Sequence, residues 1–271
     1  MIDQKTTEFV LSRPALIYIA QQLGIKYIIG VELDEFKLPA QELRNIINKG
    51  KKQLIDQGFL SSRNTRLINS SSLNDLVKTI GFRDLAFVLI REIRGVGKQL
   101  FMFNFFDNFI VEHTFPVEGM HRLALISTTE ELYKRLGQLL PLSPVYQDGR
   151  PEFRISKSAF ESALQILKSG DKGSAVLIFK ESGLKPDLLE RFMSCLELPE
   201  FTLSIACFLI KNDKVRNTSS ASIFADQHSA WGIWPDNMKI DPPIMLVFPS
   251  GITDIYSAVQ DWLKARNRGT L

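Results

Sequence analysis

A glycine-rich turn followed by lysine, Gly95-Val-Gly-Lys98, is the first place in this sequence to look for chemistry, because such turns can cradle a phosphate. A Walker-type loop also needs a glycine five residues before the Gly-Lys pair and a serine or threonine after the lysine. Glu92 and Gln99 stand at these two positions. The segment is therefore predicted to be a turn between two strands.

The histidines are the second candidate, as metal ligands. His113 and His121 could approach each other if their strands pair, whereas His228 lies in a distant part of the sequence. A zinc site needs a third ligand and usually a fourth, and no cysteine or carboxylate stands at a recognisable spacing to supply them. We therefore predict no metal and no cofactor, with histidines that belong to strand faces or turns.

Motifs of nucleophilic catalysis are missing from the sequence as well. It contains no Gly-x-Ser-x-Gly elbow and no cysteine–histidine signature. Cys195 and Cys207 sit in apolar surroundings and are predicted to be reduced core residues. We therefore predict no catalytic residue and no enzyme, while an enzyme with a pocket between two halves of the chain remains an alternative.

Residues that could contact a protein partner are found at two places. Phe106 precedes Asp107-Asn108, which reads as a hairpin tip, and an exposed aromatic side chain at such a tip could bind a partner. Trp234 stands beside Pro235-Asp236 and raises the same possibility. The candidate partner-binding residues are Phe106, Asp107, Asn108 and Trp234.

A basic cluster, Lys49-Gly-Lys-Lys52, supports a different hypothesis. It lies on a predicted helix that is followed by Gln57-Gly-Phe-Leu60, an arrangement similar to the recognition helix and wing of a winged-helix protein. The lysines could contact phosphates. Against this hypothesis, Asp56 adds an opposing charge and the strands that follow are too long for a wing. A winged-helix-type nucleic-acid-binding regulator that uses the Lys49–Lys52 segment is therefore the first alternative, ahead of the enzyme.

Composition and charge narrow the class of protein. The 271 residues are 45% hydrophobic and 23% charged, as in ordinary globular proteins. The net charge of +3 is too small to indicate nucleic-acid binding by itself. The N-terminal residues are polar, and no apolar run reaches the roughly 18 residues of a membrane helix. We expect a cytoplasmic protein without a membrane span; the sequence does not indicate its oligomeric state.

Hydrophobic periodicity predicts a similar order of elements in both halves of the chain. The first half is expected to contain helices at 12–24, 39–58 and 70–80, strands at 84–91, 99–105, 109–115 and 122–127, and a closing helix at 129–140. The second half is expected to contain helices at 156–168, 175–181 and 186–195, strands at 201–210, 220–226, 230–234 and 243–248, and a closing helix at 252–263.

The flanks of the two halves also match. Leu11-Ser-Arg-Pro-Ala-Leu opens the first and Ile155-Ser-Lys-Ser-Ala-Phe the second, and the closing helices begin after Ser127-Thr-Thr-Glu and Ser250-Gly-Ile-Thr. We therefore expect an α+β fold: a central antiparallel sheet flanked by helical bundles, internally duplicated with pseudo-twofold symmetry. The halves are placed at 1–145 and 146–271, and together they are expected to form one compact domain.

The layout resembles the EspG family of type VII (ESX) secretion chaperones. The resemblance rests on the order of elements, with the opening segment 11–24, the helix ending at Gly58-Phe-Leu60, the strands after Phe82, and the ending 230–263. It implies the same sheet flanked by helical bundles, and a chaperone that binds the helical tip of a PE–PPE pair in the cytosol before export.

The composition departs from that family, because this chain is rich in Lys, Asn, Ile and Phe, whereas the actinobacterial members are rich in Ala and Arg. The fold could be shared while the client differs. The sequence thus predicts a non-catalytic, cytosolic, protein-binding adaptor similar to a secretion chaperone, whose client is a helical hairpin protein.

Overall fold

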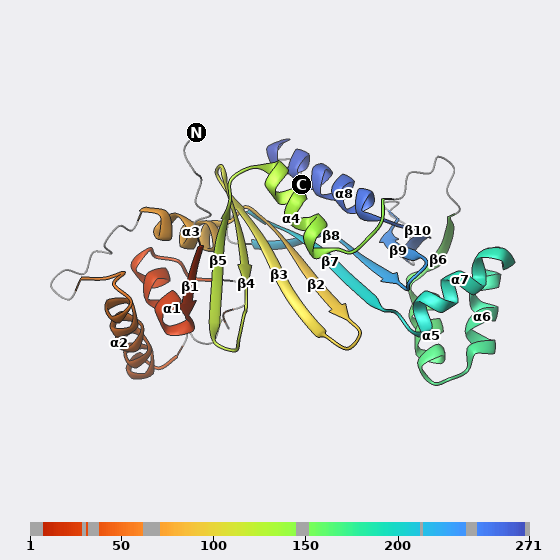
Figure 1. The fold of residues 1–271 in the computed structure, drawn as a ribbon, viewed down its shortest axis with the longest axis horizontal. Coiled ribbons are helices and arrows are strands. Elements are labelled where there is room, and N and C mark those ends of the chain that lie inside the picture. The colour runs from red at the N-terminus through yellow and green to blue at the C-terminus, as the bar shows by residue number, and fades with distance from the viewer. Residues whose placement is uncertain are drawn as a thin grey trace. The chain divides into compact units, whose positions relative to one another are not determined.

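A computed structural model describes residues 8–28, 31, 38–61, 71–144, 152–211, 214–236 and 243–268. Within these residues the chain forms eight helices and one sheet of ten strands, in the order β1-β5-β4-β3-β2-β7-β8-β9-β10-β6 (Figure 1). The helices are α1 (Arg13–Gln22), α2 (Ala40–Asp56), α3 (Ser71–Phe82), α4 (Thr129–Leu139), α5 (Lys157–Lys168), α6 (Lys172–Glu181), α7 (Pro186–Glu197) and α8 (Ile252–Arg268).

The strands of the first half are β1 (Glu8–Ser12), β2 (Leu85–Ile93), β3 (Gly97–Phe106), β4 (Phe109–Thr114) and β5 (Met120–Ile126). Those of the second half are β6 (Phe153–Ser156), β7 (Phe201–Lys211), β8 (Lys214–Ala225), β9 (Ala230–Pro235) and β10 (Ile244–Pro249). Neighbours such as β3 and β4, β4 and β5, and β9 and β10 are antiparallel. The predicted α+β class with a central antiparallel sheet is confirmed.

Strands β1 and β6 were not expected from the sequence. Each is short and runs directly into a helix through a serine N-cap, so the periodicity of the helix masks the strand before it. The Ser12 hydroxyl accepts a hydrogen bond from the Ala15 N–H at 3.3 Å, and the Ser156 hydroxyl accepts one from the Ala159 N–H at 3.2 Å.

The strands of the two halves follow the same spatial order from the edge of the sheet to its centre. From one edge the order is β1-β5-β4-β3-β2, and from the other it is β6-β10-β9-β8-β7. In both halves, the edge strand leads into the first helix of that half. The strand that pairs with the edge strand is the last strand of the same half. This agreement favours the internal duplication, which stays a prediction.

The chain divides into two compact units. Unit 1 comprises Met1–Phe87, Leu100–Leu132 and Leu209–Arg216, and unit 2 comprises Val88–Gln99, Tyr133–Phe208 and Asn217–Leu271. The expected boundary between residues 145 and 146 falls within 145–151, outside the described residues. That boundary therefore stays a prediction.

In unit 1, helices α1, α2 and α3 bury their apolar sides together with strands β4 and β5. Val111 of β4 and Leu123 of β5 are fully buried among side chains from all three helices. The β3 strand is buried on both faces, because Phe101, Phe103 and Phe105 alternate with the equally buried Met102 and Asn104.

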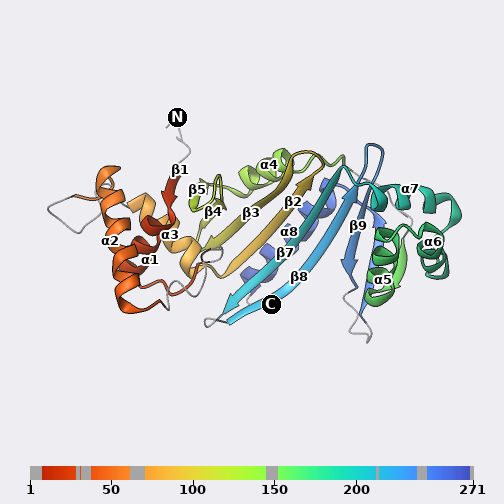
Figure 2. The ribbon, with the colours of Figure 1, turned by 90° about the horizontal axis from the view of Figure 1, so that it is seen from below.

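In unit 2, helices α5, α6 and α7 cover the strands at the β6 edge. Phe153 of β6, Trp231 of β9 and Val247 of β10 join their core. The long helix α8 runs along the strands of this unit, as Figures 1 and 2 show, with Ile255 and Val259 fully buried.

Strand β7 is covered on one face only. Phe201, Leu203, Ile205, Cys207 and Leu209 are buried, while Ser204 between them is exposed. Strand β8 alternates in the same way, with Ala221 and Ile223 buried and the side chains between them partly open. Because α5 to α7 end short of these strands, one face of β7 and β8 is left accessible beside them.

Candidate functional site

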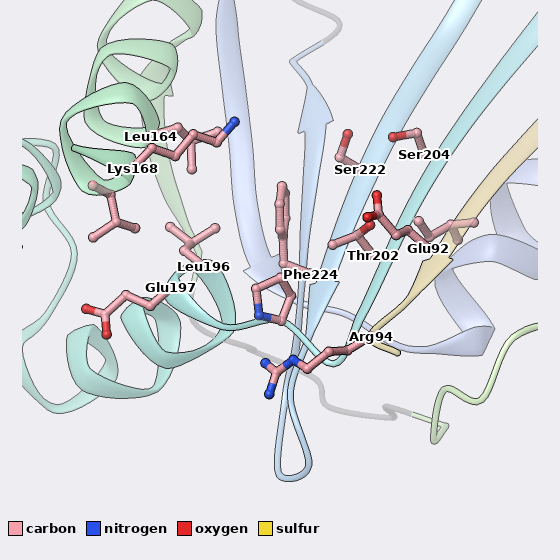
Figure 3. Close-up of a pocket in the computed structure, with 13 residues that line it drawn as sticks. Glu92, Arg94, Leu164, Lys168, Leu196, Glu197, Thr202, Ser204, Ser222 and Phe224 are labelled. Atoms are coloured by element: carbon pink, nitrogen blue, oxygen red, sulfur yellow. The ribbon is translucent and has the colours of Figure 1, made fainter. Parts of the chain in front are cut away.

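The accessible face of β7 and β8 forms the floor of a pocket of about 610 Å³ in unit 2. Thr202 and Ser204 of β7 and Ser222 of β8 supply hydroxyl groups to this floor. These three hydroxyls have no side-chain partner among the described residues, so they can bind water or a ligand. Phe224 of β8 stands between the floor and the helices (Figure 3).

The walls of the pocket are apolar and come from two helices. Leu164 projects from α5, and Leu196 lies at the end of α7 (Figure 3). Leu167 of α5 also lines the pocket. Leu164, Leu167 and Phe224 are half-buried and also pack against the core of unit 2. These side chains thus contact the packed core on one side and expose apolar surface to the pocket on the other.

Charged side chains of both signs surround the apolar part. Lys168 of α5 and Glu197 of α7 are opposed by Glu92 and Arg94 of the β2 side (Figure 3). Glu197 is also paired with Lys172, with 2.7 Å between Lys172 Nζ and Glu197 Oε1. The rim is therefore electrically balanced and does not select a strongly charged ligand.

Arg94 connects the pocket rim to the loop after α7. Its N–H donates to the Glu200 carbonyl oxygen at 2.9 Å, and its guanidinium donates to the Leu198 carbonyl oxygen. Leu198 and Val96, near this connection in the sequence, are 69% and 68% exposed.

The chemistry available here is apolar contact combined with hydrogen bonding, which suits recognition of a side chain or a short chain segment. All residues that line the pocket belong to unit 2. Among the described residues, no group of three or more His, Cys, Asp or Glu side chains could hold a metal ion.

The structure places Phe106, Asp107 and Asn108 at the β3–β4 hairpin tip, as predicted. Phe106 pairs with Phe109, and Asp107 has φ of 49°, the left-handed conformation of a tight turn. Phe106 is half-buried and its ring lies 6.1 Å from that of Phe82, between centroids. Phe82 and Phe109 are both exposed, so the tip does carry an aromatic surface.

Trp234 belongs to β9 in unit 2, whereas the hairpin tip belongs to unit 1. Its half-buried indole stacks on Phe248 with 6.4 Å between centroids and an interplanar angle of 11°. It also lies over Gly232, where an added Cβ would come 2.7 Å from the indole nitrogen. A packing role accounts for these contacts; partner binding by the four residues stays a prediction.

His113 and His121 do approach each other, because β4 and β5 pair. His113 Nε2 lies 2.9 Å from His121 Nδ1. The Gly95–Gly97 segment is a turn between β2 and β3, as expected, with φ of 78° at Gly95 and 101° at Gly97. Its glycines therefore serve the backbone conformation of a hairpin.

The lysine cluster lies on α2, with Lys49 and Lys52 exposed. Gly50 between them is buried against the Pro14 backbone. Among the described residues, α2 is followed along the chain by α3 rather than by a hairpin that could act as a wing. The winged-helix arrangement on which the nucleic-acid hypothesis rested is therefore not observed in this part of the chain.

Comparison with known proteins gives a structural likeness and no sequence relative. No family model matches the chain, and no curated protein matches it. A solved structure matches over 95% of this chain and 96% of its own chain, with a TM-score of 0.69 and 10% identity: the type VII secretion system chaperone EspG5 of Mycobacterium tuberculosis, in complex with a PE25–PPE41 dimer.

The chain has the fold of EspG5. The resemblance expected from the order of elements is thereby confirmed at the level of fold. The 10% identity explains why only that order, and no motif, pointed to it. Within the described residues, no helix is both long and apolar enough to span a membrane.

Sequence reasoning missed the pocket. The alternation in 201–210 predicts a strand with one apolar face, and the residues between the apolar ones face the opposite side. A row of small hydroxyl residues facing away from an apolar row, as with Thr202 and Ser204, is the signal that indicates an accessible sheet face. The residues of α5 and α7 that complete the pocket give no such local signal.

Proposed function

We propose that this protein is a non-catalytic, chaperone-like adaptor that binds a protein client in the unit 2 pocket. The client is a helical hairpin protein, and binding takes place in the cytoplasm. An apolar side chain of the client enters between Leu164, Leu196 and Phe224, while its backbone or polar groups bond to the strand hydroxyls. No cofactor takes part.

The observation that carries this proposal is the accessible face of β7 and β8 beside an apolar helical wall. Partly open leucine and phenylalanine side chains gain contact area when a partner covers them, and apolar burial drives most protein association. The fold supports the same role, since EspG5 is a chaperone whose structure was solved with a protein dimer.

The hairpin residues Phe106, Asp107 and Asn108, together with Trp234, are proposed as further client contacts. The tip presents an aromatic surface formed with Phe82 and Phe109, but Trp234 is engaged in stacking on Phe248.

Site-specific cross-linking in the native host tests the proposal. A photoreactive amino acid is placed at Ser204 or Lys168 in the pocket, at Asn108 on the hairpin tip, and at Lys180 as the control. Lys180 is exposed on α6 and lies outside the pocket lining. We expect one protein to be cross-linked from positions 204 and 168 and identified by mass spectrometry, with no such product from position 180.

A blocking variant shows whether the captured protein occupies the pocket. Ser204→Arg fills the floor from an exposed position, and Gln165→Arg adds the same side chain to α5 outside the lining. We expect at least about a tenfold loss of the cross-link from position 168 with Ser204→Arg and none with Gln165→Arg. Equal products from positions 168 and 180, or a product unaffected by Ser204→Arg, would overturn the proposal.

A further inference from the structure

The buried histidine pair of unit 1 has no role in the proposed client site. His113 is 0% and His121 is 2% exposed. Their rings are in direct contact, with 2.9 Å between His113 Nε2 and His121 Nδ1. The ring of Phe115 lies against both, at 4.7 Å and 5.3 Å between centroids. The pair is therefore shut off from solvent on the side of Phe115.

A hydrogen bond between two imidazoles needs one nitrogen that donates and one that accepts. The contact can be made by two neutral rings or by a pair that shares a single added proton. A second proton would leave two facing N–H groups and break the bond. His113 Nδ1 has no hydrogen-bond partner in the structure, so nothing there stabilises a charged ring.

Among the described residues, the charged groups that act on the pair are cationic. Arg83 at the end of α3 is buried over the ring of Tyr27, and Arg13 lies at the start of α1; both raise the positive potential at the histidines. No described carboxylate hydrogen-bonds to either imidazole. A proton taken up by the pair therefore adds charge to a site that is already positive.

The nearest acidic side chain on β4, Glu112, points away from the histidines. Side chains alternate along a strand, so Glu112 beside His113 and Arg122 beside His121 both lie on the opposite face. Arg122 binds carboxylates on that far side, at 3.7 Å from Glu112 and 2.7 Å from Glu8. These two carboxylates therefore do not neutralise a charge on the histidine pair.

Burial is the main cause of the low basicity of both rings. It lowers the pKa of His113 well below its usual value, helped by His121 and Arg83. It lowers the pKa of His121 to about 4, helped by Arg13. Both histidines are thus neutral at pH 7.

The pair lies beneath the junction of β1, α1 and β5. His121 is the direct partner of Leu11 in the β1–β5 register. One step further, the Arg13 N–H at the start of α1 donates to the Gly119 carbonyl oxygen at 2.8 Å. His121 is therefore part of the strand segment whose pairing holds the edge strand and the first helix.

We propose that the His113–His121 pair is an acid-sensitive lock, whose protonation separates the two rings and releases β1 and α1 from β5. At neutral pH the neutral pair keeps this edge of the sheet closed. In acid, the two imidazolium rings repel each other and are repelled by Arg83 and Arg13. This repulsion decreases when the edge of the sheet opens and the rings become solvated.

The direction of the pH effect follows from the difference between the closed and open states. An exposed histidine has a pKa near 6.5, so the open state binds protons that the closed state rejects. The stability of the closed state is complete above about pH 6.5 and falls as the pH decreases toward 4. For His121 alone, the open population rises on the order of a hundredfold between pH 7.5 and pH 4.5.

Hydrogen exchange of backbone amides, corrected for the intrinsic pH dependence, measures this opening. We expect the protection of the amides of residues 9–20 to fall on the order of a hundredfold between pH 7.5 and pH 4.5. The amides of β6 in unit 2 serve as the internal reference and should change much less. Equal losses in both regions would overturn the lock.

The matched variant replaces the histidines with amides that cannot take up a proton. Glutamine at 113 reproduces the position of Nε2 and asparagine at 121 that of Nδ1, so H113Q/H121N can keep the contact. We expect this variant to lose the acid response of residues 9–20, and His228→Gln, at an exposed histidine, to retain it. An unchanged response in H113Q/H121N would overturn the proposal.

If H113Q/H121N does not fold, histidine NMR of the unmodified protein decides instead. The imidazole signals of His113 and His121 should keep their neutral shifts above pH 5 and lose dispersion together with the signals of α1 below it. Reversible titration of either ring near pH 6.5 in the folded protein would show that no lock exists.

Discussion

At the scale of single residues, close packing in the described parts of the chain accounts for residues that looked functional in the sequence. Gly50 interrupts the lysine cluster because α1 approaches α2 there: a Cβ on Gly50 would lie 2.0 Å from the Pro14 carbonyl oxygen. Trp234 covers Gly232 for a similar reason. Both glycines allow a close approach that any side chain would prevent.

Gly50→Ala should therefore destabilise unit 1. The new methyl group must push α1 and α2 apart, and forced overpacking of this kind costs about 1–3 kcal/mol. Urea denaturation followed by circular dichroism measures the loss. Gly173→Ala is the control, because the nearest atom to its Cβ would be Asp171 Oδ1 at 3.7 Å, an ordinary contact. If both variants were as stable as the parent protein, α1 and α2 would not be in tight contact at Gly50.

At the scale of elements, side-chain caps start several of the helices, among them α1, α4 and α5. The Thr128 hydroxyl accepts from the Glu131 N–H at 3.1 Å, while the Glu131 carboxylate accepts from the Ser127 N–H at 2.7 Å. This reciprocal arrangement is a capping box, and it satisfies two backbone N–H groups at the start of α4. Ser12 and Ser156 cap α1 and α5 in the same position relative to the edge strands.

Ser156→Ala should cost about 1 kcal/mol of unfolding free energy, because the Ala159 N–H loses its acceptor at the start of α5. Thermal or urea unfolding checks this value. Ser72→Ala, at an exposed serine of α3, serves as the control and should cause no loss. A Ser156→Ala protein as stable as the parent would show that the cap contributes nothing here.

At the scale of the whole molecule, the core of unit 2 holds both cysteines. The thiols of Cys195 in α7 and Cys207 in β7 are fully buried, and neither forms a disulfide. Burial is the main cause that raises the pKa of Cys195 to about 11. The reduced, buried state predicted from their apolar surroundings is confirmed.

Both thiols should react with a disulfide reagent far more slowly in the native protein than in urea. At pH 8 the raised pKa alone lowers the thiolate fraction of Cys195 about a hundredfold relative to its usual pKa of 9.0, and burial blocks access as well. Absorbance after addition of the reagent follows the reaction. A native thiol that reacts at the rate of the unfolded chain would contradict the packed core of unit 2.

Sequence periodicity by itself predicted the described helices, the strands other than β1 and β6, and the antiparallel α+β class. These features depend on neighbours within a few residues, such as the alternation from Phe201 to Leu209 or the cap at Ser12. The sequence did not predict strands β1 and β6, because they are too short to show alternation before the helix begins.

Only the tertiary structure revealed the pocket, and only the tertiary structure decided that His113 and His121 meet, an approach that the sequence left conditional on strand pairing. The pocket joins Glu92 of β2 to Leu164 of α5 and Phe224 of β8, and the contact depends on the register that places His113 beside His121. Local sequence records whether a residue favours a helix, a strand or the core. Which distant residues meet depends on strand order and on where the helices stop covering the sheet, and that is decided by packing of the chain as a whole.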